Sequence, residues 1–186
     1  MYREELTQPL RAYLLFLPSL LFGALGLVWL WFRPFPYTAQ LGLGGQLGLA
    51  AALTAGLLGG AWALYRTLAS FRYASKLIER ALRPVSLTLP LILLLAAGSA
   101  LAEELFFRGA LLPLLGVWGQ ALVFGLLHPA TRRGWSYTAF TFVAGLVFGY
   151  ATLYSGSLWP AILAHFVVNA HGFNDARLKR TKRLDT

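Results

Sequence analysis

The chain of 186 residues has no cysteine and few charges, since Asp, Glu, Lys and Arg together make up 12% of it. The lack of cysteine excludes disulfide bonds, thiol nucleophiles and cysteine-ligated zinc. A soluble globular domain carries about 25% charged residues, roughly twice the density found here. Hydrophobic residues account for 58% of the chain. The composition therefore favours an integral membrane protein, and we expect residues 1–186 to form a single domain.

Six apolar stretches are candidates for membrane-spanning helices, each of which takes about 20 residues. They cover residues 13–32, 41–65, 87–112, 117–128, 136–154 and 158–173. The stretches are apolar all round and rich in Leu, Ala and Gly, rather than alternating between apolar and polar residues as the strands of a membrane barrel do. We therefore predict an all-α fold, a polytopic bundle of about six transmembrane helices.

Acidic residues are scarce, and the distribution of the basic ones indicates how the chain crosses the membrane. Lys and Arg accumulate in short cytoplasmic loops. With both termini inside, the cytoplasmic segments hold 14 of the 16 basic residues, namely Arg3, Arg11, Arg66, Arg72, Lys76, Arg80, Arg83, Arg132, Arg133, Arg177, Lys179, Arg180, Lys182 and Arg183. We therefore predict N-in, C-in topology in a bacterial-type inner membrane. We therefore expect the basic residues to lie beside the lipid bilayer, and we do not expect them to bind a nucleic acid.

The segment 66–84 between the second and third stretches is amphipathic. Apolar residues recur at helical spacing on one face, and basic residues occupy another: Leu68, Phe71, Ile78 and Leu82 against Arg72, Lys76, Arg80 and Arg83. Such a pattern is typical of a basic helix lying on a membrane surface. A solvated connector that follows the positive-inside bias is the alternative.

Three ionisable residues lie inside the third apolar stretch. Glu103 and Glu104 are adjacent there, and Arg108 follows shortly after them. A charge at mid-bilayer costs at least about 2.5 kcal/mol, so such residues point to a function. Glu104 and Arg108 are four residues apart, which places them on one helical face as a potential ion pair. Glu103 is rotated by about 100° and can face another helix. A buried network that only holds helices together is the structural alternative.

Two histidines and an asparagine lie in later apolar stretches. His128 ends the fourth, while His165 and Asn169 share a face of the sixth because they are four residues apart. Counting the helical rise from the outer ends of the spans, Glu103, His128, His165 and Asn169 reach similar depths. A glutamate and a histidine around one water molecule can hydrolyse an amide by general base catalysis. His165 and Asn169 can donate hydrogen bonds to the oxyanion that forms.

Other chemistries remain open at this point. Two carboxylates and two histidines could bind a divalent metal, and His171 is a further candidate ligand. However, the His-Glu-x-x-His signature of zinc proteases is absent. A serine protease could use Ser155 or Ser157 with a histidine base, although these serines lie in a turn that more simply joins two spans. A proton-coupled transporter also places Glu and His inside a bundle, but it commonly shows an inverted repeat, and we find none.

Three motifs in this order resemble a known family. Glu103-Glu104-Leu-Phe-Phe-Arg108, Phe124-Gly-Leu-Leu-His128 and His165-Phe-Val-Val-Asn169 are similar to the Glu-Glu-x-x-x-Arg, Phe-x-x-x-His and His-x-x-x-Asn motifs of the CAAX protease and bacteriocin-processing family. The members of this family are also called abortive-infection-like intramembrane glutamic endopeptidases. The resemblance covers residues 87–169, which we expect to be the catalytic core.

The resemblance implies a role for each motif residue. Glu103 and His128 would activate a water, and His165 and Asn169 would form the oxyanion site. Glu104 and Arg108 would support them, and the resemblance leaves open whether Glu104 also shares in catalysis. The expected activity is cleavage of a membrane-associated peptide or protein without cofactor or metal. A catalytically silent relative, acting as a membrane scaffold or bacteriocin-immunity protein, is the alternative, and the resemblance leaves the substrate and any recognition of a prenyl tail open.

Overall fold

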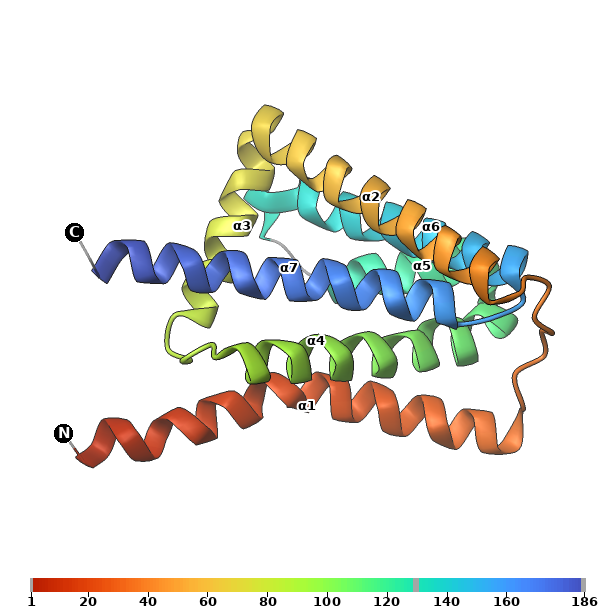
Figure 1. Ribbon diagram of the computed structural model, residues 1–186, viewed down its shortest axis with the longest axis horizontal. Helices are drawn as coiled ribbons and strands as arrows, with labels where there is room; N and C mark the ends of the chain where they lie inside the picture. Colours follow the sequence, from red (N-terminus) through yellow and green to blue (C-terminus); the bar gives the residue numbers. More distant parts are fainter. Residues whose placement is uncertain (1, 129–130, 185–186) are drawn as a thin grey trace.

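The computed structural model describes residues 2–128 and 131–184, and these residues form helices without any strand (Figure 1). The α-helices are α1 (Tyr2–Phe32), α2 (Leu43–Thr67), α3 (Ala69–Leu82), α4 (Leu89–Glu104), α5 (Leu112–Leu127), α6 (Trp135–Ser155) and α7 (Trp159–Leu184). A π-helix, η1 (Leu105–Leu111), joins α4 to α5, and a short 3-10 helix, η2 (Arg132–Gly134), precedes α6. The prediction of an all-α fold is confirmed.

The long helices run side by side, so that both ends of the described chain lie at one end of the bundle. Helix α1 packs against α4, α4 against α7 and α7 against α2, while α5 and α6 pack together behind them (Figure 1). The first turns of α1, the last turns of α7 and the whole of α3 lie at the left end of the view in Figure 1. The two termini thus share a side, as N-in, C-in topology requires. Which side faces the cytoplasm stays a prediction.

Within the described part of the chain, four helical stretches are long and apolar enough to cross a membrane: Leu14–Phe32, Leu43–Thr67, Leu89–Leu127 and Arg132–Ser155. The third is 39 residues long and contains two of the predicted spans. Its chain direction reverses near Gly116, whose φ of 69° and ψ of 179° belong to a region open essentially to glycine alone. Helix α7 carries several polar residues, including His165 and Asn169, which lower its hydropathy. The count of six crossings therefore stays a prediction.

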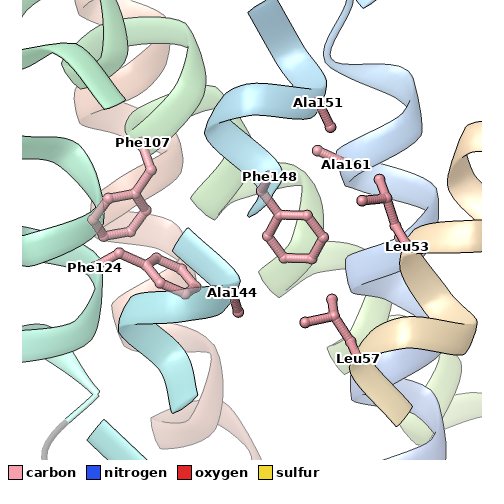
Figure 2. Close-up of a cluster of buried hydrophobic side chains, with 9 residues drawn as sticks. Leu53, Leu57, Phe107, Phe124, Ala144, Phe148, Ala151 and Ala161 are labelled. Carbon is pink, nitrogen blue, oxygen red and sulfur yellow. The ribbon is translucent and has the colours of Figure 1, made fainter. Parts of the chain in front are cut away.

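The surface of the bundle is apolar, as expected for contact with lipid. Large side chains of α1 are more than half exposed, among them Leu17 at 61% and Leu20 at 66%. The buried core is made of smaller and aromatic residues from several helices. Figure 2 shows Phe148 of α6 at its centre, with Phe107 and Phe124 on one side and Leu53 and Leu57 on the other.

Helices α5 and α6 approach each other closely at Gly145. A Cβ atom at this position would lie 2.9 Å from the Cα of Ala121, a distance that real side chains do not tolerate. The carbonyl of Gly145 accepts a hydrogen bond of 2.8 Å from Nε2 of Gln120, a fully buried residue of α5. Since a buried amide must be hydrogen-bonded, this contact joins the two helices at one register.

The amphipathic segment 66–84 contains helix α3, which packs its apolar face on α6. Phe71 is buried, and its ring centroid lies 5.6 Å from that of Phe140 in an edge-to-face arrangement. Leu82 is also buried, whereas Ile78 is 39% exposed and so belongs only partly to the packed face. The location of α3 on the membrane surface stays a prediction.

Candidate active site

The two adjacent glutamates lie at the point where α4 changes into the π-helix η1. Both are buried, and Glu104 is the last residue of α4. The hydrogen bonds of a π-helix run from i to i+5, and such segments occur mainly as single turns at functional sites. Helix α1 packs tightly here, because a Cβ on Gly26 would lie 2.9 Å from backbone atoms of Leu105 and Phe106. The sequence analysis did not predict this change of helix type.

The carboxylate of Glu103 faces both histidines. Its Oε2 lies 3.5 Å from Nε2 of His128 and 3.8 Å from Nε2 of His165. The side chain of Glu103 is 12% exposed, and that of His128 is 25% exposed, so neither side chain is completely enclosed. Among the described residues, Glu103 Oε2 is buried without a hydrogen-bond partner. This oxygen therefore keeps lone pairs available for a water molecule.

Glu104 links the π-helix to α7 through a single oxygen. Its Oε1 accepts hydrogen bonds of 2.8 Å from Arg108 Nη1 and of 2.8 Å from His165 Nδ1. The side chains of Glu104 and Arg108 are fully buried. The ion pair expected from their spacing is thus present, and it also orients the imidazole of His165. His165 lies between the two glutamates, while Glu103 also faces His128 and Glu104 also pairs with Arg108, so the 100° rotation gives each glutamate one further neighbour of its own.

Arg108 is surrounded by aromatic rings. Its guanidinium carbon lies 4.5 Å from the ring centroid of Phe124 and 5.0 Å from that of Phe148. Nη2 approaches the carbonyl of Gly145 at 3.4 Å. Cation–π contacts of this kind stabilise a desolvated cation by about 2 kcal/mol or more. The sequence analysis missed this aromatic enclosure, because the rings come from α5 and α6.

The two imidazoles are held in different ways. His128 Nδ1 lies 2.8 Å from the carbonyl oxygen of Phe124. Because a carbonyl can only accept, Nδ1 carries a proton, and when the ring is neutral Nε2 faces Glu103 as an acceptor. His165 is more deeply buried and is stacked on Phe148, with ring centroids 5.4 Å apart. Its two nitrogens face the two glutamates.

Asn169 lies one helical turn away from this cluster. Its Nδ2 donates a hydrogen bond of 2.9 Å to Oγ of Ser99 on α4. Ser99 precedes Glu103 by four residues, and Asn169 follows His165 by four. The Ser99–Asn169 and Glu103–His165 contacts between α4 and α7 therefore lie one helical turn apart. The structure thus brings together Glu103, Glu104, Arg108, His128 and His165, and it places Asn169 one helical turn away from them. The i, i+4 spacing of Ser99 and Glu103 was a signal that the sequence analysis did not use.

The other residues named for alternative chemistries, Ser155, Ser157 and His171, have structural partners or are exposed. Ser155 Oγ donates to the carbonyl of Ser157 at 3.0 Å, and Ser157 Oγ donates to Oε1 of Gln46 on α2 at 3.0 Å. These serines stabilise the turn between α6 and α7. His171 is exposed on α7, six residues after His165.

Comparison with known proteins identifies the part of the chain that carries the cluster. Residues 85–171 match the family described as type II CAAX prenyl endopeptidase Rce1-like. Through this segment the chain is similar to the Rce1-like family. The chain is also similar to the uncharacterized protein YpbD of Bacillus subtilis (strain 168), with 31% identity over 100 residues. That alignment covers 52% of the chain and 51% of YpbD, so the chain spans about half the length of this curated relative. No solved structure matches the chain.

The Rce1-like segment contains every residue of the cluster and Asn169. It begins just before α4 and ends within α7, so α1 and α2 lie outside it. The resemblance noted from the three motifs and the family match agree on the same helices. Similarity to the Rce1-like family over this segment and the apolar helices support an integral membrane protein, and the similarity supports a CAAX-type intramembrane protease kind of function.

Proposed function

We propose that the protein is an intramembrane endopeptidase that cleaves a peptide bond of a membrane-associated peptide or protein with a water molecule activated by Glu103. The proposal rests on one observation: Glu103 Oε2 lies 3.5 Å from His128 Nε2 and 3.8 Å from His165 Nε2. Both histidines come from helices distant in sequence, and both point toward the same carboxylate oxygen. No step needs a metal, a cysteine or a serine.

The proposed nucleophile is a water that donates its two hydrogens to Glu103 and His128. Glu103 Oε2 and the unprotonated Nε2 of His128 are both acceptors, and a distance of 3.5 Å between them allows one water to bond to both. Glu103 takes a proton as the water oxygen attacks the carbonyl carbon of the peptide bond. The tetrahedral intermediate then collapses, the carbon–nitrogen bond breaks, and the proton passes to the leaving amine.

The proposed oxyanion site uses His165 and Asn169. His165 Nδ1 donates to Glu104 at 2.8 Å, so Nε2 can also donate when the ring carries both protons. The Asn169 amide uses one N–H on Ser99, and the second N–H is the proposed donor to the oxyanion. Each such donor in a water-poor site contributes about 3 kcal/mol to transition-state stabilisation.

In this proposal Glu104 and Arg108 position the site and do not contact the substrate. Glu104 holds the imidazole of His165, and Arg108 compensates the buried charge of Glu104 at 2.8 Å. Removing the charge of Glu104 would leave His165 free to rotate on its stack with Phe148. In this proposal the two adjacent glutamates have different roles, because Glu103 is the base and Glu104 positions His165.

The test is cleavage of a fluorogenic peptide with a CAAX end, in prenylated and unprenylated forms, by the purified protein in lipid nanodiscs. We expect Glu103→Gln to lower kcat by at least about a hundredfold, the contribution of a general base. The matched control is Asp175→Asn, which also replaces a carboxylate by an amide. Asp175 lies on α7, and its side chain is 51% exposed. It should cleave at the wild-type rate.

The alternative functions predict other results. Wild-type-like cleavage by Glu103→Gln would reject Glu103 as the base. Activity that is lost with a chelator and regained with zinc would favour a metal-dependent protease. If an unbiased comparison of membrane peptides from cells with and without the protein revealed no cleaved product, a silent scaffold or immunity protein would be the better description.

A further inference from the structure

A second site lies at the end of the bundle that holds α3, far from the glutamates. A pocket of about 410 Å³ is formed where α3 ends, where α4 begins and where the late turns of α7 pass. Its lining runs from Glu79 to Thr88 and from Ala176 to Arg180. Glu103 lies 14 residues beyond the first residue of α4, which is about 21 Å along the helix. The pocket is therefore separate from the candidate active site.

The lining of this pocket is basic. Arg83, Arg177 and Arg180 face one acidic residue, Glu79, so the formal charge of the lining is positive. Arg180 is ordered by a hydrogen bond of 2.8 Å from its Nη1 to the carbonyl of Val85. Arg83 approaches Glu79 at 3.5 Å, the outer limit of a hydrogen bond, and its side chain is 47% exposed. An incoming anion can therefore compete for Arg83.

The beginning of α4 adds a partial positive charge on the same side. Thr88 caps the helix, with its Oγ1 accepting from the backbone N–H of Leu91 at 3.4 Å. The N-terminal end of a helix carries a partial positive charge and favours anions. The hydroxyls of Ser86 and Thr88 both line the pocket. Arginine guanidinium groups and hydroxyls around a helix start are the groups that bind phosphate oxygens.

The surroundings of the pocket favour an amphiphilic ligand over a free ion. Leu82, Val85 and Leu87 line it beside the arginines and belong to a buried apolar cluster. On α4, directly after the pocket, Leu89 is 54% exposed and Leu94 is 59% exposed. These leucines continue along the outside of the bundle, where acyl chains would lie. A phosphate headgroup in the pocket and acyl chains along α4 fit this polarity.

We propose that this pocket binds the phosphate headgroup of an anionic glycerophospholipid. Arg83 and Arg180 hold the phosphate oxygens, the start of α4 contributes its N–H dipoles, and the acyl chains lie along the exposed leucines of α4. The bound lipid would connect the ends of α3, α4 and α7. The site does not depend on the peptidase mechanism, so either proposal can fail alone.

The test measures lipid binding to the full chain in detergent micelles by native mass spectrometry. Phosphatidylglycerol, phosphatidylcholine and inorganic phosphate are titrated separately and then in competition. We expect binding of phosphatidylglycerol and little binding of phosphatidylcholine, whose headgroup has no net charge. Arg83→Gln should weaken phosphatidylglycerol binding by about tenfold, the loss expected for a charge-assisted hydrogen bond. Arg180→Gln should weaken it similarly, and its melting temperature shows whether the loss of the Val85 contact unfolds the chain.

The matched control is Arg132→Gln, because Arg132 is exposed in η2 and does not line the pocket. It should bind phosphatidylglycerol with wild-type affinity. Equal weakening by Arg132→Gln and Arg83→Gln would overturn the proposal in favour of a diffuse basic surface. Equal affinity for phosphatidylcholine would also overturn it. Displacement of phosphatidylglycerol by equimolar inorganic phosphate would identify a free anion site instead of a lipid site.

Discussion

The hydroxyl of Ser99 accepts a hydrogen bond from Nδ2 of Asn169 at 2.9 Å, one helical turn from the contact between Glu103 and His165. Both pairs join α4 to α7. The Ser99 hydroxyl itself donates to the carbonyl of Ala96 at 3.3 Å, so its orientation is determined by α4. Ser99 therefore orients a side chain that we place in the oxyanion site.

This relationship predicts a graded loss of activity. Asn169→Ala should lower kcat by about a hundredfold or more, because it removes an oxyanion donor. Ser99→Ala should lower kcat by about tenfold with KM nearly unchanged, because Asn169 remains but loses one orienting hydrogen bond. Steady-state kinetics on the fluorogenic peptide measure both effects. Ser75→Ala is the control, since Ser75 bonds within α3 to the carbonyl of Phe71; a loss as large as that of Ser99→Ala would contradict the assignment.

Arg108→Ala should destabilise the protein as well as inactivate it. The change leaves the buried Glu104 without its cation, which typically costs about 3–5 kcal/mol. Thermal unfolding in nanodiscs, followed by intrinsic fluorescence, measures the loss. The double change Glu104→Gln with Arg108→Met should recover part of the stability but no activity, because neither position of the former pair then carries an unpaired charge while His165 has lost the Glu104 carboxylate. A normally stable Arg108→Ala protein would argue against the pairing.

The two histidines should behave differently when replaced. His165→Ala removes a buried ring that bonds to Glu104 and stacks on Phe148, so we expect losses of both activity and stability. His128→Ala removes a side chain that is 25% exposed, so we expect a loss of activity with a melting temperature close to that of the wild type. Parallel melting and cleavage measurements separate the two. Equal destabilisation by both variants would show that His128 also has a structural role.

Gly145→Ala should separate α5 from α6. The new Cβ would lie 2.9 Å from the Cα of Ala121, and overpacking of this kind costs about 1–3 kcal/mol. The displaced carbonyl would also lose its bond from Gln120. Gly48→Ala on α2 is the control, because a Cβ there meets nothing within 4 Å and alanine is a better helix former than glycine. Melting temperatures should fall for Gly145→Ala alone, and an equal fall in both variants would contradict the close packing.

Local spacing in the sequence was enough to predict part of this structure. The apolar stretches predicted helices, because only a helix satisfies its own backbone in lipid. The break near Gly116 falls between two predicted spans. The four-residue spacing of Glu104 and Arg108 predicted their ion pair, since 3.6 residues per turn bring such side chains together without help from the rest of the chain.

Contacts between helices were decided only by the tertiary structure. Sequence spacing placed His165 and Asn169 on one face, but it did not show that His165 Nδ1 contacts Glu104 while Asn169 contacts Ser99. This pairing of side chains depends on the register of α7 against α4, and that register follows from the packing of the two helices along their whole length. The aromatic rings around Arg108 and the basic pocket beside α3 arise in the same way, from residues that are distant in the chain. A helical repeat determines which residues share a face, and only the packing of the bundle determines what that face contacts.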